Sequence, residues 1–261
     1  AYILPLMVDL SKGMATLSNT AMAIAGGLLI FVLLTGPTYY IMSTITGSIG
    51  DYFARAVPHG FQTYTFFDEN VTSWFQSWTL TFMVWWLAWA PFVGVFIARI
   101  SKGRTIREYL LGVILVPTFF SIFWFGVFGS VGFYGVLKID APIMEVLKTN
   151  INDTTFFVLR QLPLSTPTII ATVLAAFLFV VTSVVSASFV LSMFAVGGDL
   201  NPPTRIKIIW GVILGALGLV MILSNSIDAV KSIIGLAALP FVFIVLLITV
   251  CLLKALKSEE V

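Results

Sequence analysis

The sequence predicts an all-α integral membrane protein with about six transmembrane helices. Of its 261 residues, 59% are hydrophobic and only 10% are charged, whereas a soluble domain carries roughly 25% charged residues. A chain of this composition cannot cover itself against water, so a lipid bilayer is the solvent that fits it. Six apolar runs are long enough to cross about 30 Å of hydrocarbon. They cover residues 20–44, 76–99, 109–133, 167–194, 206–224 and 232–253.

The connections between these runs also carry structural signals. Apolar residues recur at helical spacing within 45–75, which favours a helix lying along the membrane surface. A second short helix is expected around 141–149. Glycine and proline cluster in GGDLNPPTR at 197–205, which predicts a turn. The start, AYILPLMVDLSKG, has no initiating Met and no basic leader, so we expect it to be the tail of an apolar helix that something preceded.

The basic residues predict an orientation, because cytoplasmic loops of membrane proteins are enriched in Lys and Arg. The loop after the second run, ARISKGRTIRE, is the richest in basic residues. Placing that loop in the cytoplasm leaves nine basic residues inside and five outside, with both ends of the chain cytoplasmic. The formal net charge of +2 is too small to argue for a nucleic acid partner.

Tryptophans are concentrated in one segment, WFQSWTLTFMVWWLAWAPF at 74–92, which holds five of the seven in the chain. On a regular helix Trp78, Trp85 and Trp89 lie within about 40° of one another, with Trp86 roughly 60° beyond Trp89 and Phe82 close to Trp86. An aromatic belt at the headgroups explains the first tryptophans of the segment. It does not explain Trp85, Trp86 and Trp89, which lie roughly 10–16 Å deeper.

Such a wall of aromatic rings suits a quaternary ammonium group. This cation has no N–H donor, and aromatic faces attract it through their quadrupole. Helix packing is the alternative interpretation of the same stripe. Catalysis is not expected, because no nucleophile, base and carboxylate converge in the sequence and no metal-ligand or phosphate-binding motif occurs.

The stretch SWTLTFMVWWLAW, followed by PFVGVFIARISKGRTIRE, resembles the signature of the betaine/choline/carnitine transporter family. The family pattern is Trp-Thr, an aromatic residue, then Trp-x-Trp-Trp, and Met83 replaces one family tryptophan. The resemblance extends from about Leu17, through LLTGPTYY, to Lys254. It implies the second half of an inverted-repeat (LeuT-like) transporter fold, comprising about the last six of twelve transmembrane helices.

The resemblance also implies site residues. The substrate-binding candidates match aromatic positions along the central pathway of the family: Trp85, Trp86, Trp89, Phe82 and Phe92. Thr182 and Ser183 match the Thr-Ser pair of a sodium site, with the carbonyl of Phe179 as a further oxygen ligand. Val185 stands where many relatives carry an aspartate. Without the resemblance, these two hydroxyls would be expected to bond back to their own helix.

The implied function is secondary active transport, by alternating access, of a quaternary-ammonium solute such as glycine betaine, choline or carnitine. Sodium symport is favoured over proton symport, because the spans contain no carboxylate or histidine to relay a proton. The alternatives are a sodium-independent exchanger and a non-transporting half-length subunit. No cofactor is expected beyond a coupling sodium ion.

The resemblance also implies how the chain is divided into domains and in which membrane it lies. Residues 1–44 are expected to hold the end of a preceding helix and the last helix of the first repeat. An extracellular surface helix or loop follows at 45–75, and 76–261 form the second repeat with a short tail. The expected partners are the solute, the bilayer, a missing N-terminal half and a homotrimer, in a bacterial inner membrane.

Overall fold

The computed structural model describes residues 10–224 and 227–259, in which every regular element is a helix and no strand occurs. The expected tail of a preceding helix, in the first nine residues, lies outside the described residues. Six helical segments are long and apolar enough to cross a membrane, which confirms the predicted number of spans. They are Gly13–Thr35, Glu69–Ile100, Ile106–Lys138, Ser165–Ala195, Thr204–Leu223 and Ser232–Ser258.

The C-terminal end of the first span differs from the prediction. Helix α2, Leu10–Thr35, stops nine residues before the expected end at 44, and α3, Thr38–Gly60, begins almost at once. The break lies at Gly36-Pro37, because a residue before proline is driven out of the α region. The amide of Gly36 still donates to Val32 O (2.9 Å), and Ile41 N donates to Pro37 O (3.0 Å). A helix is therefore present where one was expected within 45–75, but it starts earlier. Its position along the membrane surface stays a prediction.

Two of the spans contain a π-helical segment near their N-terminal ends. The second span runs through α4 (Glu69–Trp74), the π segment η1 (Phe75–Leu80) and α5 (Thr81–Ile100). The third runs through α6 (Ile106–Leu110), the π segment η2 (Leu111–Leu115) and α7 (Val116–Lys138). The hydroxyl of Thr81 donates to Gln76 O, five residues back, at 2.9 Å. The sequence had suggested regular helices throughout.

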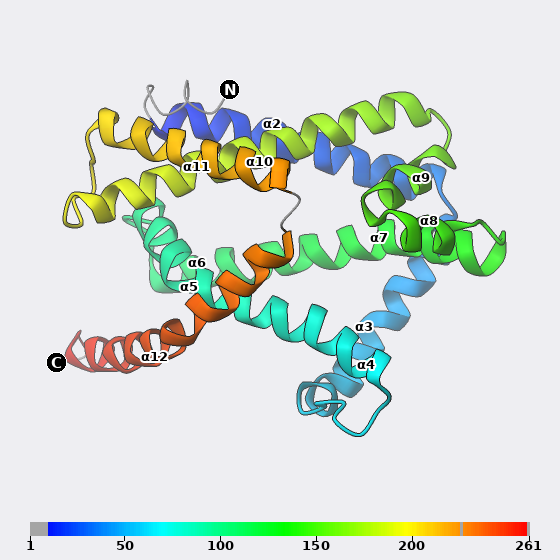
Figure 1. The fold of residues 1–261 in the computed structure, drawn as a ribbon, viewed down its shortest axis with the longest axis horizontal. Helices are drawn as coiled ribbons and strands as arrows, with labels where there is room; N and C mark the ends of the chain where they lie inside the picture. Colours follow the sequence, from blue (N-terminus) through cyan, green and yellow to red (C-terminus); the bar gives the residue numbers. More distant parts are fainter. Residues whose placement is uncertain (1–9, 225–226, 260–261) are drawn as a thin grey trace. The chain divides into compact units, whose positions relative to one another are not determined.

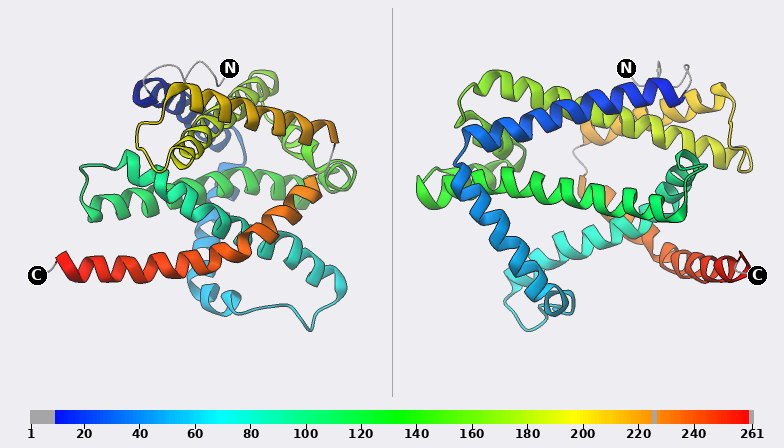
Figure 2. Two further views of the ribbon diagram at one scale, coloured as in Figure 1. Left: turned by 60° about the vertical axis from the view of Figure 1, so that its left-hand side comes forward. Right: turned by 180° about the vertical axis from the view of Figure 1, so that it is seen from behind.

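The chain divides into two compact units. The first comprises residues up to 60 together with 104–185. In it α2 and α3 both pack against α7 (Figure 2), and their apolar side chains form its core. The core residues are Val32, Ile41, Ile45, Val127, Val131, Leu159 and Leu162. Short helices follow α7, namely α8 (Ile143–Thr149), η3 (Ile151–Asp153) and α9 (Thr154–Arg160). Helix α8 confirms the prediction around 141–149, whereas α9 was not expected.

The second unit comprises residues 61–103 and the chain from 186 onward. Its main packing is that of α5 against α12, Ile227–Glu259 (Figure 1). Helix α10, Ser165–Ala195, ends in this unit, and α11, Thr204–Ser224, follows it. The turn predicted at 197–205 lies between them. Gly197 and Gly198 supply its positive φ angles of 72° and 91°, which favour glycine.

Helix α3 approaches α7 closely at Gly126. A methyl group at Gly126 would lie 2.5 Å from Ile45 Cγ1, whereas one at Gly129 would meet nothing within 4 Å. Gly126→Ala is therefore expected to destabilise the protein by about 1–3 kcal/mol through overpacking. The measurement is the melting temperature of the purified protein in detergent.

Gly129→Ala is the matched control, one helical turn away on α7. It should leave the melting temperature unchanged or raise it, because alanine favours a helix by up to about 1 kcal/mol over glycine. Equal melting temperatures for the two variants would contradict the close packing of α3 on α7.

Candidate functional site

All five predicted aromatic residues lie on α5, and four of them form two pairs of rings. Phe82 and Trp86 are one helical turn apart, with ring centroids 6.0 Å apart and planes at 65°. Trp89 and Phe92 are 5.7 Å apart, with planes at 82°. Both are edge-to-face arrangements, which aromatic pairs prefer. The spacing of the sequence on a helix brought these partners together, as expected.

The three deep tryptophans remain accessible. Trp86 is 64% exposed, and Trp85 and Trp89 are 43% and 41% exposed. Packing against other described residues therefore leaves a large part of each indole ring uncovered. In a span, such rings face either lipid or a pathway, and the pairs on α5 do not by themselves close into a box. An aromatic cage, in which these rings surround a quaternary ammonium group, therefore stays a prediction.

Trp85 has a cavity beside it. This cavity, of about 150 Å³, is lined by Leu80, Thr81, Val84, Trp85, Ile234 and Gly235, which come from the second span and α12. Pockets for small organic ligands usually have roughly 300–1,000 Å³. The cavity is thus too small to enclose a solute alone. Ile234 and Gly235 carry no sequence signal that could have identified them, because their place here depends on how α12 packs.

The three predicted oxygen ligands lie together on α10. Thr182 Oγ1 donates to Phe179 O at 3.0 Å, and Ser183 Oγ donates to the same carbonyl at 2.8 Å. One helical turn thus gathers two hydroxyls and a carbonyl. The same bonds are those expected if the hydroxyls serve only their own helix, so both interpretations of the pair fit this geometry.

The turn on α10 fits a sodium ion in the type of its donors. A hard cation takes oxygen ligands, and a hydroxyl that donates to a carbonyl keeps lone pairs for a cation. Three oxygens are half or fewer of the six to eight that calcium, a hard cation of similar size, takes, so the other ligands must come from elsewhere. Val185 is fully buried and supplies no oxygen from its side chain. No cluster of His, Cys, Asp and Glu that could hold a metal ion occurs in the described part of the chain.

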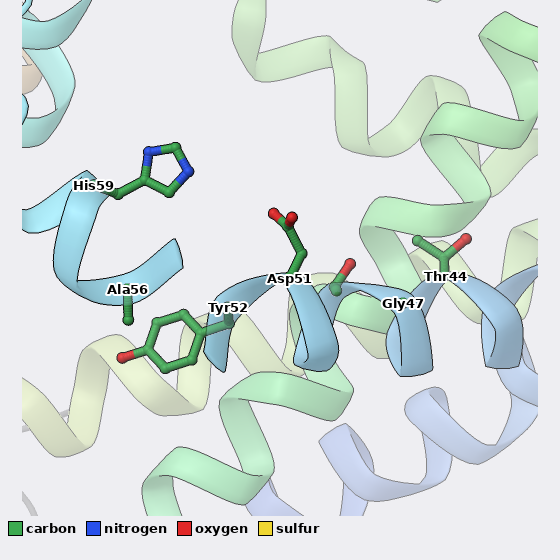
Figure 3. Close-up of a pocket in the computed structure, with 7 residues that line it drawn as sticks. Thr44, Gly47, Asp51, Tyr52, Ala56 and His59 are labelled. Atoms are coloured by element: carbon green, nitrogen blue, oxygen red, sulfur yellow. The ribbon is translucent and has the colours of Figure 1, made fainter. Parts of the chain in front are cut away.

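Two larger cavities in the first unit involve none of the predicted residues. One, of about 580 Å³, lies along α3, and all of its lining residues come from that single helix (Figure 3). Its acidic residue, Asp51, is engaged in an ion pair with Arg55 at 2.7 Å. The other, of about 550 Å³, has a mainly apolar lining from α7, α8 and α9. A surface formed by one helix cannot enclose a ligand, and the lining residues of the second cavity include no titratable side chain.

Comparison with known proteins gives consistent matches along the whole chain. A family model described as the betaine/carnitine/choline family transporter, BCCT, matches residues 1–261. The chain is 39% identical over 262 residues to the glycine betaine transporter OpuD of Bacillus subtilis, covering 99% of this chain and 50% of that protein.

Two further relatives are named for other solutes. The chain is 32% identical over 259 residues to the ectoine/hydroxyectoine transporter of Virgibacillus pantothenticus, covering 99% of this chain and 51% of that protein. It is 34% identical over 252 residues to the high-affinity choline transport protein of Escherichia coli K12, covering 95% of this chain and 37% of that protein. The chain spans about half or less of the length of these relatives.

Proposed function

The chain belongs to the betaine/carnitine/choline transporter family, and we propose that it works in the secondary active transport of a quaternary-ammonium solute. Members of this family are transporters, not enzymes, and the chain is a multi-pass membrane protein. The proposed solutes are glycine betaine, choline and carnitine. Two of the relatives are named for glycine betaine and choline.

The observation that carries this proposal is the set of accessible indole rings on α5. Trp85, Trp86 and Trp89 keep 41% to 64% of their surface exposed on a helix inside a candidate span. A desolvated aromatic face attracts a permanent cation by about 2 kcal/mol or more. We propose Trp86 as the principal ring of the cage, supported by its contact with Phe82. Trp85, Trp89 and Phe92 would line the pathway beside it.

We also propose that sodium drives the transport. The oxygens of Phe179, Thr182 and Ser183 support this coupling because they would supply part of an ion site on α10. The alternative within transport is a sodium-independent exchanger, which would use the aromatic site without the ion. The alternative of another kind is a non-transporting membrane subunit, in which the rings of α5 only pack.

The proposed setting follows the family template. The chain would form the second inverted repeat of a LeuT-like fold together with an N-terminal half, in a bacterial inner membrane. Both ends of the chain would lie in the cytoplasm, because this places nine of the fourteen basic residues inside. Assembly as a homotrimer is part of the same proposal.

The test is solute uptake by the protein expressed from the complete reading frame that contains residues 1–261. Proteoliposomes should accumulate labelled glycine betaine, choline or carnitine when an inward sodium gradient is imposed. Unlabelled ectoine serves as a competitor that probes the breadth of the site. Uptake that persists without sodium, and accelerates when solute is present on the other side, would favour the exchanger. Folded protein that takes up none of the solutes would overturn the proposal.

A further inference from the structure

The C-terminal end of α5 is attached to the turn between α10 and α11. The guanidinium of Arg99 donates from Nε to the carbonyl of Leu200 at 3.1 Å and from Nη2 to Oδ1 of Asn201 at 2.6 Å. The planar guanidinium can satisfy two acceptors at once, and hydrogen bonds from a charged donor are stronger than those between neutral groups. These bonds join residues about one hundred positions apart.

The turn that contacts Arg99 has hydrogen bonds of its own. Gly198 N donates to Met193 O at 2.8 Å, which closes the end of α10. Asn201 N donates to Oδ1 of Asp199 at 2.9 Å, which holds the following residues. These bonds hold the backbone on both sides of Leu200, whose carbonyl accepts from Arg99. A backbone acceptor that is already held loses little conformational freedom when it is bound.

An apolar contact lies beside these hydrogen bonds. The ring of Phe92 on α5 lies 6.3 Å from that of Phe194 near the end of α10, and Phe92 also contacts Trp89. Ring contacts thus connect Trp89, a predicted substrate-binding residue, through Phe92 to α10. We call the set Phe92, Arg99, Phe194, Leu200 and Asn201 the α5–α10 joint. All of its residues belong to the second unit.

We propose that Arg99 and Asn201 are positioning residues that make α5 and the end of α10 move as one body during transport. This inference rests on the proposed function, because α5 carries the aromatic site. Arg99 lies about 20 Å along the helix from Trp86, at 1.5 Å per residue, so it does not touch a solute bound there. Arg99 and Asn201 thus act on the conformational step and not on solute binding.

The test compares Arg99→Ala, Asn201→Leu and the double variant in proteoliposomes. Each single variant is expected to lower turnover per folded transporter about tenfold, the effect of losing a hydrogen bond to a charged group. The double variant should be no worse than either single one, because the two residues make one contact. Equilibrium binding of labelled solute should change less than twofold. Asn201→Asp should keep wild-type turnover, since a carboxylate still accepts from Arg99.

Lys102→Ala is the matched control. It removes a positive charge from the same connection, and Lys102 makes no hydrogen bond or ion pair in the part of the chain that the structure describes. Its turnover should equal that of the wild type. Losses that add in the double variant, or a fall in the amount of folded protein with unchanged turnover per molecule, would overturn the inference. Absence of uptake by the wild type would instead overturn the proposed function.

Discussion

Trp86→Leu is expected to weaken binding of a quaternary-ammonium solute by at least about 30-fold. This factor corresponds to the loss of about 2 kcal/mol from one desolvated aromatic face. Leucine keeps the site apolar but removes the ring quadrupole, and it also removes the edge-to-face contact with Phe82. Uptake at low solute concentration should be abolished, while the protein still reaches the membrane. The measurement is equilibrium binding of labelled solute, together with initial uptake rates.

Controls separate the attraction of the ring for a cation from its size. Trp86→Phe keeps an aromatic face and should retain most of the binding. Trp74→Leu removes an exposed indole from the first turn of the same span, at the expected headgroup level, and should leave binding unchanged. A neutral tert-butyl isostere of choline should compete poorly with choline in the wild type, and this preference for the cation should be lost in Trp86→Leu. Unchanged binding by Trp86→Leu would remove the cage from the proposal.

Replacing both Thr182 and Ser183 with alanine is expected to remove the stimulation of uptake by sodium. The two hydroxyls and the carbonyl of Phe179 form one group of oxygens, and the double variant leaves only the carbonyl. The sodium concentration for half-maximal uptake should rise by at least about tenfold, or about 1.4 kcal/mol in ion binding. Solute binding measured without sodium should stay close to that of the wild type. The readout is uptake as a function of sodium at constant ionic strength.

The control for this double variant is Thr172→Ala on the same helix. The hydroxyl of Thr172 also donates to the carbonyl four residues back, Thr168 O, at 2.8 Å, so it loses the same kind of local bond. Its sodium dependence should be that of the wild type. If Thr172→Ala and the double variant behave alike, the hydroxyls on α10 only serve their own helix. A wild type that ignores sodium would favour the exchanger.

Much of the fold could be predicted from the sequence because bilayer crossing is a strong constraint on composition. Each span needs about 20 apolar residues, and the six predicted runs all correspond to helices. The end of the first span was wrong because residues 38–44 contain no charged side chain that would mark an end. The backbone nevertheless breaks at Gly36-Pro37. The helix α9 was missed because its seven residues follow a polar stretch that gives no clear periodicity.

The candidate site could be predicted only as far as a single helix determines it. The contact of Phe82 with Trp86 and the grouping of Thr182 and Ser183 around Phe179 O follow from helical spacing. The contacts of Phe92 with Phe194 and of Arg99 with Asn201 join segments about one hundred residues apart. Such contacts depend on how packed helices settle against each other, which residue spacing within one helix does not specify.

The π segment η1 changes the meaning of the tryptophan stripe. A π turn holds one residue more than an α turn, since its hydrogen bonds skip five residues instead of four. The indoles of Trp74 and Trp78 are therefore out of rotational phase with those of α5, and a regular helix would align them differently. Deleting one residue from Phe75–Leu80 would turn Trp74 by about 100° relative to Trp85. Because of the extra residue, Trp74 can lie on a different face of the continuous span from Trp85 and Trp89.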